Sequence, residues 1–192
     1  MVDDAAWLLV GLGNPAAEGY GNTRHNLGAD VVALLAERAG ERLKRSKNRA
    51  HVAELRHEGR RVVLARPDSY MNLSGGPVSL LARYYKAPPT QVVVIYDDID
   101  LPAGKLQVRR GGGTAGHNGL KDIVKALGTP DFVRVRLGVG RPPGRQDPAD
   151  YVLEQIPKRL SEDIGVLVTR AADAAMDLVV MPVEEAQNRH NG

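Results

Sequence analysis

Val92-Val-Val-Ile-Tyr-Asp-Asp-Ile-Asp100 is the stretch that decides the fold of this 192-residue chain. Its first five residues, 92–96, form an apolar run of the kind that builds a buried strand. Three carboxylates follow directly, at Asp97, Asp98 and Asp100. In open α/β sheets, ligands bind beyond the carboxyl ends of the strands. The stretch therefore predicts a buried strand that delivers acidic side chains to a binding crevice.

On either side of this stretch, strand patterns alternate with helix patterns. Further strands are predicted at Leu8–Val10, 50–57, 61–66, 105–110 and 132–139, and the second and third of these form a hairpin around Glu58-Gly59. Helical spacing covers 28–39, 118–127, 158–180 and a segment from Ser74, as its N-cap, to about Lys86. The alternation predicts an α/β fold: a single-domain sandwich over residues 1–192, with a twisted, mixed but mostly parallel sheet and helices on both faces.

The glycine-rich stretch Gly111–Asp122, GGGTAGHNGLKD, is the most informative part of the chain for its function. Glycine tolerates positive φ and allows close approach of a ligand to the backbone. The apolar spacing after it places His117 and Asn118 where a loop becomes a helix, beside unpaired backbone N–H groups that suit a phosphate or an oxyanion. The alternative is an irregular loop without a binding role.

Composition limits the classes of protein that fit. The chain has no cysteine, which removes disulfides and thiolate chemistry and fits a reducing cytoplasm. Its apolar content of 43% is ordinary for a globular protein, and no stretch approaches the roughly 20 apolar residues of a membrane span. The beginning, MVDDAAWLLVG, carries acids where a signal peptide carries bases, so no export is expected.

Charge is strongly segregated along the chain, although the net charge is only +3. Residues 38–66 hold ten Lys and Arg against three acids, and residues 101–145 hold nine against two. Two basic segments on an otherwise acidic chain favour a polyanionic partner, most simply nucleic acid. Aromatic residues are only 4% of the chain, which favours contact with the backbone of a folded RNA over stacking on single strands. The alternative is a solvated charged surface.

Two histidines are candidates for acid–base chemistry: His25, in a loop before a helix, and His117. Asp97 supplies a carboxylate in the same predicted crevice, and Asn14 and Asn72 follow two other strands. A His–Asp pair without an obvious nucleophile indicates water activation, in which imidazole takes the proton and the carboxylate fixes its tautomer. Such general-base assistance is worth about 10²–10⁴-fold in rate.

Three other kinds of site are weaker alternatives. Ser74 lies in NLSGG, which misses the G-x-S-x-G nucleophile elbow at its first position. A metal held by two histidines and a carboxylate is conceivable, but no HExxH or comparable spacing is present. Gly11-Leu12-Gly13 resembles the start of a dinucleotide fingerprint, but position 16 is alanine and Pro15 interrupts the turn.

Six ordered motifs resemble those of bacterial peptidyl-tRNA hydrolases: GLGNP, TRHN, MNLSG, YDDIDLP, GGGTAGHNGLKD and RVRLGVGRP, between about Leu8 and Asn188. The resemblance implies a metal-free, cofactor-free, monomeric cytoplasmic enzyme. Such an enzyme cleaves the ester between a peptide and the terminal ribose of tRNA and so recycles tRNA. It also implies that His25 is the base and Asp97 its partner. Asn14, Asn72 and Asn118 would line the site, and Tyr20, Met71 and His117 would contact substrate.

By the same resemblance, Lys105, Arg109 and Arg136 clamp phosphates at the acceptor end of the tRNA. Two departures from the family pattern fall in the loop before His25: Ala16 replaces the usual glycine, and the segment 18–21 is one residue longer. The rival function is a non-catalytic RNA-binding or splicing module on the same fold. We also expect the Pro- and Gly-rich segment Arg141–Tyr151 to form a mobile cover over the crevice, with a stiff connector as the alternative.

Overall fold

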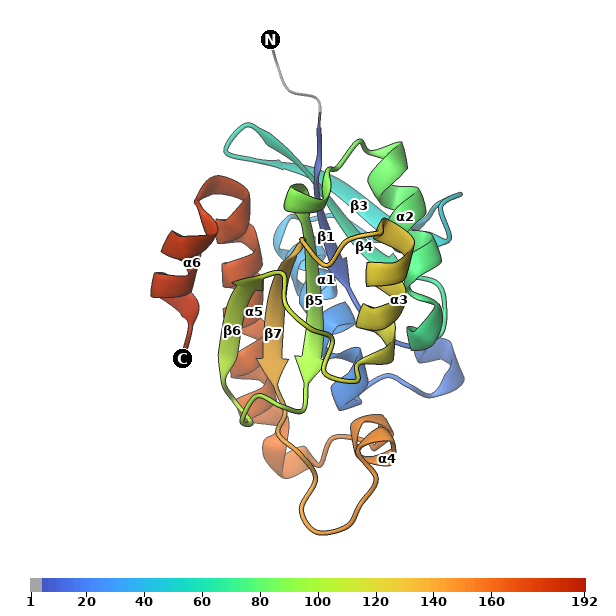
Figure 1. Cartoon of the computed structure of the whole chain (residues 1–192), viewed down its shortest axis with the longest axis vertical. Helices are drawn as coiled ribbons and strands as arrows, with labels where there is room; N and C mark the ends of the chain where they lie inside the picture. The colour runs from blue at the N-terminus through green and yellow to red at the C-terminus, as the bar shows by residue number, and fades with distance from the viewer. Residues whose placement is uncertain (1–4) are drawn as a thin grey trace.

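The computed structural model describes residues 5–192, and its strands form one seven-stranded sheet in the order β2-β3-β4-β1-β5-β7-β6 (Figure 1). The acidic start MVDD, on which the expectation about export partly rests, lies outside these residues. The four central strands are mutually parallel, and the outer pairs are antiparallel. The strands are β1 Trp7–Gly11, β2 Lys44–Arg45, β3 Ala50–His57, β4 Arg60–Pro67, β5 Val92–Asp98, β6 Leu106–Arg110 and β7 Val133–Gly138.

The predicted buried strand is confirmed as β5, which is buried along its whole length. It pairs with β1 on one side and β7 on the other, so Val94 lies beside Val10 and Arg134. β-Branched residues fill such a doubly covered strand because they pack well on a pleated surface. Its last two residues, Asp97 and Asp98, are delivered to the carboxyl edge of the parallel strands.

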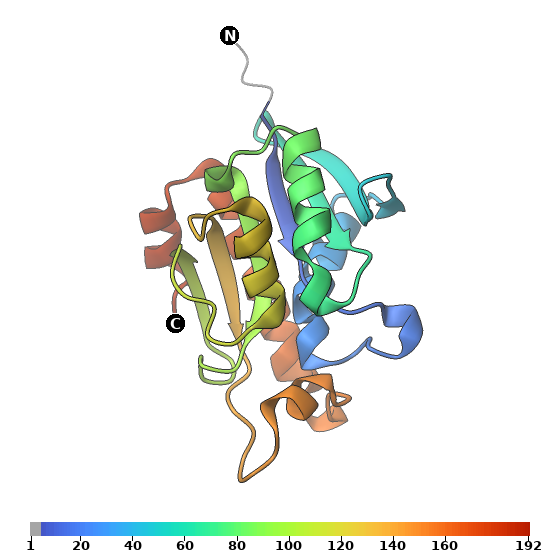
Figure 2. The ribbon, with the colours of Figure 1, turned by 45° about the vertical axis from the view of Figure 1, so that its right-hand side comes forward.

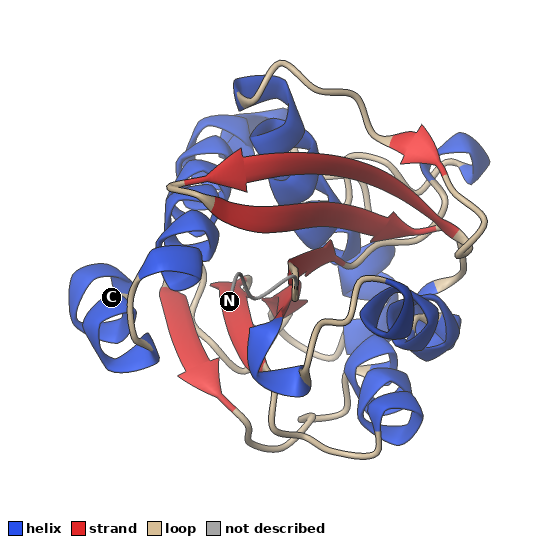
Figure 3. Ribbon diagram, turned by 90° about the horizontal axis from the view of Figure 1, so that it is seen from above, coloured by secondary structure: helices blue, strands red, loops and turns tan. Residues whose placement is uncertain are grey.

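Helices cover both faces of the sheet, as predicted (Figure 3). On one face lie α1 (Leu27–Arg38) and the long helix α5 (Ser161–Val180), with α6 (Val183–His190) beside β6. On the other face lie α2 (Gly75–Tyr84) and α3 (Asn118–Leu127), which pack side by side in front of the strands (Figure 2). Within residues 5–192 no helix is long and apolar enough to cross a membrane.

Most predicted elements agree with the structure within a few residues. The 118–127 helix and the 50–57 strand have the expected bounds, and the hairpin turns at Glu58-Gly59. Ser74 is the N-cap residue of α2, as predicted, but its side chain makes no capping hydrogen bond. Ser74 precedes α2, but its backbone is already helical, and its hydroxyl donates instead to the Met71 carbonyl at 2.6 Å.

The segment Arg141–Tyr151, for which a mobile cover is predicted, is partly helical. Its last residues belong to a short helix, α4 (Pro148–Leu153), beyond the carboxyl ends of β5 and β7 (Figure 1). Asp147 caps this helix by accepting the Ala149 N–H at 3.0 Å, and Pro148 occupies its first turn. The irregular connection is therefore confined to residues 139–147.

Candidate active site

A cleft of about 410 Å³ opens at the carboxyl ends of β1 and β5. One side is polar, and the other is mostly apolar and includes α4. The polar lining comes from five segments far apart in the sequence and contains Asn14, His25, Asn72, Asp97, His117 and Asn118. The structure thus brings together the two histidines, the aspartate and the three asparagines that the sequence singles out.

Asp97 and His25 form the chemical centre of the cleft. The Nδ1 atom of His25 lies 2.8 Å and 3.0 Å from the two carboxylate oxygens of Asp97, whose side chain is only 2% exposed. Burial lowers the pKa of His25, but the charge of Asp97 and its hydrogen bond together outweigh that effect, so the pKa is raised. With an ionised Asp97, His25 donates through Nδ1 and keeps Nε2 as a proton acceptor.

His117 is the second donor to the same carboxylate. Its Nδ1 accepts the backbone N–H of Leu120 at 3.2 Å, which assigns the ring proton to Nε2. Nε2 lies 3.3 Å from Asp97 Oδ1. Burial would raise the pKa of Asp97, but the charges and hydrogen bonds of His25 and His117 lower it far below its usual range. Asp97 is therefore an anion held between two imidazoles.

Asn14 is held rigidly by a residue that the sequence reasoning missed. The side-chain amide of Asn26 accepts the Asn14 N–H and donates to the Asn14 carbonyl, both at 2.8 Å. The Asn14 side-chain oxygen accepts the Met71 N–H at 2.7 Å, so its amide nitrogen remains available to donate into the cleft. Asn26 follows His25 in TRHN, but nothing in that motif alone indicates a partner twelve residues away.

Asn72 and Asn118 differ from Asn14 in being exposed at the mouth of the cleft. Tyr20 also lines the cleft and packs edge-to-face against Tyr70, with ring centroids 6.4 Å apart. Met71 is buried and lies against Gly119, where an added Cβ would contact its sulfur at 2.6 Å. Asn72 and Asn118 are thus placed to meet a substrate that enters from outside.

Helix α4 forms the apolar wall of the cleft and is fastened at several points. The guanidinium of Arg24 stacks on the Tyr151 ring at 4.1 Å, and the Tyr151 hydroxyl donates to the Val139 carbonyl at 2.9 Å. Val152 and Leu153 line the cleft from this helix. These contacts show why a composition-based expectation of little packing fails for residues 148–153.

Lys105, Arg109 and Arg136 are not among the described residues that line the cleft, although Arg136 contacts Asp98, which does line it. Arg136 donates to Asp98 at 2.8 Å and to Gln107, so its charge is partly neutralised. Arg109 projects from β6, and its guanidinium lies over Gly112, whereas Lys105 is exposed.

The glycine-rich loop is held by a buried cation that the sequence reasoning also missed. Arg134 is fully buried on β7 and donates to the carbonyls of Gly112, Gly113 and Pro130. The loop needs this support because several of its residues have positive φ, including the non-glycine Ala115 at 47°. It leads directly into His117.

The structure argues against the serine alternative. Ser74 is completely buried and bonded to Met71, and within residues 5–192 the cleft lining does not include it. The metal alternative has more support than the sequence spacing suggested, since ligand atoms of His25, Asp97 and His117 lie within 4.8 Å of one another. However, the nitrogens of both imidazoles that face Asp97 are already in hydrogen-bond contact with it.

The fold and the site together define an α/β enzyme with a His–Asp pair in an open cleft. The family profile of peptidyl-tRNA hydrolases matches residues 8–192. A peptidyl-tRNA hydrolase of Frankia alni is 52% identical over 189 residues, covering 98% of this chain and 95% of the relative. One of Nocardia farcinica is 50% identical, covering 95% and 94%. The chain belongs to the peptidyl-tRNA hydrolase family.

Solved structures agree with this assignment. The crystal structure of a peptidyl-tRNA hydrolase from Acinetobacter baumannii superposes with a TM-score of 0.90 at 34% identity, covering 100% of this chain and 97% of the other. The Arg119Gln mutant of the Acinetobacter protein gives a TM-score of 0.91 at the same identity. The likeness therefore extends over the whole α/β fold.

Proposed function

We propose that this protein hydrolyses the ester between a peptide, or an N-blocked amino acid, and the terminal ribose of tRNA, with a water activated by His25. The observation that carries the proposal is the buried Asp97 carboxylate bonded to His25 Nδ1 at 2.8 Å inside an open cleft. Family membership supports the reaction, and the His–Asp geometry supports the role of water.

The proton movements follow from the geometry. Water attacks the ester carbonyl as its proton passes to His25 Nε2, and Asp97 stabilises the resulting imidazolium. The negative charge that develops on the carbonyl oxygen is met by an amide N–H, for which Asn14 is suited because its oxygen is already engaged by Met71. The imidazolium then protonates the departing ribose oxygen. The products are a peptide carboxylate and free tRNA.

Substrate selection is assigned to the exposed end of the cleft. Asn72 and Asn118 each offer a donor and an acceptor, the pair of groups that a peptide bond needs. Free aminoacyl-tRNA lacks that peptide bond, so these amides would be left without their partner and the wrong substrate would be disfavoured. Tyr20, Met71 and His117 complete the contacts around the acyl group.

On the tRNA side, we propose that Lys105, Arg109 and Arg136 contact phosphates of the acceptor end. Lys105 is exposed, whereas Arg136 must exchange part of its contact with Asp98 for the phosphate. We further propose that residues 141–147 order over bound substrate, with α4 as their fixed base. In the cell, the protein would recycle tRNA from abandoned peptides as a metal-free cytoplasmic monomer, with residues 1–192 acting as one domain.

The test is the release of a labelled N-acetylated amino acid from charged tRNA by the purified protein with a chelator present. We expect turnover on the acetylated substrate and little on the free aminoacyl-tRNA. Absence of turnover would favour the rival, a non-catalytic RNA-binding module. Turnover that is abolished by the chelator and restored by a divalent cation would favour the metal alternative at His25, Asp97 and His117.

A further inference from the structure

A second depression, of about 380 Å³, continues the cleft along the outer side of α3. We call it the α3 groove, and it is lined by Asn72, Asn118, Lys121, Asp122 and Lys125. Two of these residues, Asn72 and Asn118, also line the catalytic cleft. The α3 groove is therefore continuous with the exposed end of the cleft.

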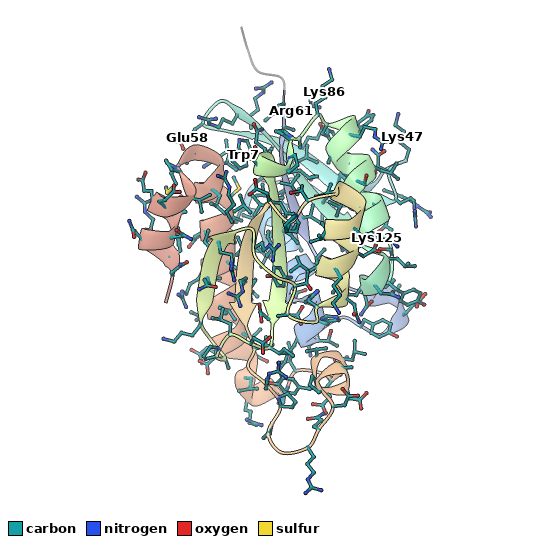
Figure 4. All side chains as sticks on the ribbon, viewed as in Figure 1. Trp7, Lys47, Glu58, Arg61, Lys86 and Lys125 are labelled. Carbon is teal, nitrogen blue, oxygen red and sulfur yellow. The ribbon has the colours of Figure 1, made fainter. Side chains whose placement is uncertain are left out.

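The two lysines of the α3 groove form a matched pair. Lys121 and Lys125 are four residues apart on α3, which puts them on one face with a rise of about 6 Å between them. Both side chains are exposed, while Leu120 and Ile123 turn the other side of α3 into the core. Figure 4 labels Lys125 on this helix.

The charges of the two lysines are not neutralised within the described part of the chain. The ion pairs found among residues 5–192 include neither Lys121 nor Lys125. Asp122, the acid between them in sequence, also lines the α3 groove, but its carboxylate accepts the Gly75 N–H of α2 at 2.7 Å and forms none of these ion pairs with the lysines. The α3 groove thus presents two free ammonium groups beside the catalytic cleft.

We propose that the α3 groove binds two successive phosphates of the single-stranded 3′ end of the tRNA, next to the ester. The rise of about 6 Å between the two lysines along α3 is comparable with the spacing of neighbouring phosphates along a strand, and lysine binds phosphate as a point charge. Lys105, Arg109 and Arg136 are not among the described residues that line the cleft or the α3 groove, so the two lysines would add to the phosphate contacts proposed for those three residues. This inference rests on the proposed function and adds to it the path of the strand.

The experiment compares two minimal substrates, the N-acetylphenylalanyl esters of adenosine and of the trinucleotide CpCpA. Only the second carries phosphates. In the variant Lys121→Gln/Lys125→Gln, kcat/KM on the trinucleotide ester should fall about tenfold, as two exposed charge contacts would give. The slope of log(kcat/KM) against log salt should become shallower by about 1.4, or 0.7 for each phosphate on a single strand. Activity on the adenosine ester should stay within about twofold, because no contact to the nucleoside is lost.

The matched control is Arg60→Gln/Lys86→Gln, which removes two exposed charges at the amino ends of the parallel strands, opposite the cleft. Figure 4 labels Lys86 at that end of the molecule. The control should cleave both esters like the unaltered protein. If the groove variant loses kcat/KM equally on both esters, the lysines contact the acyl part. If its kcat/KM on the trinucleotide ester is unchanged, the α3 groove has no role in binding. Either result overturns the inference. A failure of the unaltered protein to cleave N-acetylaminoacyl-tRNA would instead refute the proposed function.

Discussion

Replacing Asp97 by asparagine tests the catalytic pair with the least change in shape. Asp97 accepts from His25 at 2.8 and 3.0 Å and faces His117 at 3.3 Å. An asparagine can turn its amide nitrogen toward His25 Nδ1, which moves the ring proton to Nε2 and removes the base. A loss of general-base assistance predicts a fall in kcat of about 10²–10⁴-fold.

The same substitution also predicts a change in pH dependence. In the proposed mechanism neutral His25 is the active form, so kcat/KM of the native protein should rise as pH increases through the raised pKa of His25. Without the charge of Asp97, burial becomes the dominant influence and lowers that pKa. The acidic limb of the pH profile of Asp97→Asn should therefore move to lower pH. The ratio of native to variant activity should shrink as pH falls.

The assay is release of labelled N-acetylated amino acid from tRNA between about pH 5 and 8, the range where histidine titrates. Asp68→Asn is the matched control, because Asp68 lies 2.6 Å from His51 Nδ1 in a pair that is partly exposed. The control should keep the native rate and profile. A loss of less than about tenfold in Asp97→Asn, or an acidic limb that stays in place, would refute the role given to this carboxylate.

Three further predictions concern the structure around the site. Ser74→Ala should keep native turnover and lose about 0.5–1.5 kcal/mol of unfolding free energy, since only the hydrogen bond to Met71 disappears. Loss of activity in a folded variant would instead support Ser74 as the nucleophile. In a denaturant titration, Gly28→Ala should lower the unfolding free energy by about 1–3 kcal/mol, because the added Cβ would clash with the Ile95 carbonyl. The control Gly165→Ala should be neutral or stabilising in the same titration, because the space around Gly165 is open. In hydrogen exchange, amides of 141–147 should exchange rapidly in the free protein and slow when a non-hydrolysable peptidyl-tRNA analogue binds, and equal rates in both states would make the segment a connector.

The sequence predicts the framework of this fold well because its signals are local and strong. The run Val92–Tyr96 has no reasonable place except a buried strand, and the spacing of Leu120, Ile123 and Val124 defines one face of α3. The elements that were missed have weak apolar signals. β2 is two exposed basic residues, and α6 buries only Ala186. The Asp147-Pro148 start of α4 is a usable helix signal, but it was outweighed by the neighbouring prolines and glycine.

The sequence could predict those site residues whose positions are set by the ends of the strands. Asn14 follows β1 and Asp97 lies at the end of the neighbouring parallel strand β5, so their meeting follows from topology. The hydrogen bonds of Asn26 to Asn14 and of Arg134 to the glycine loop depend on tertiary packing that no spacing in the sequence encodes. A strand arginine is normally expected in solvent, and only the loop folded over β7 makes Arg134 a buried support.

The most direct test of the central claim compares His25→Ala with His51→Ala on N-acetylaminoacyl-tRNA in the presence of a chelator. Each variant removes an imidazole paired with an aspartate, but only His25 lines the cleft. The account predicts a loss of at least about 10²-fold in kcat for His25→Ala, with both variants folded and His51→Ala as active as the native protein. A folded His25→Ala variant that retains more than about one tenth of native turnover would contradict the claim that His25 activates the water.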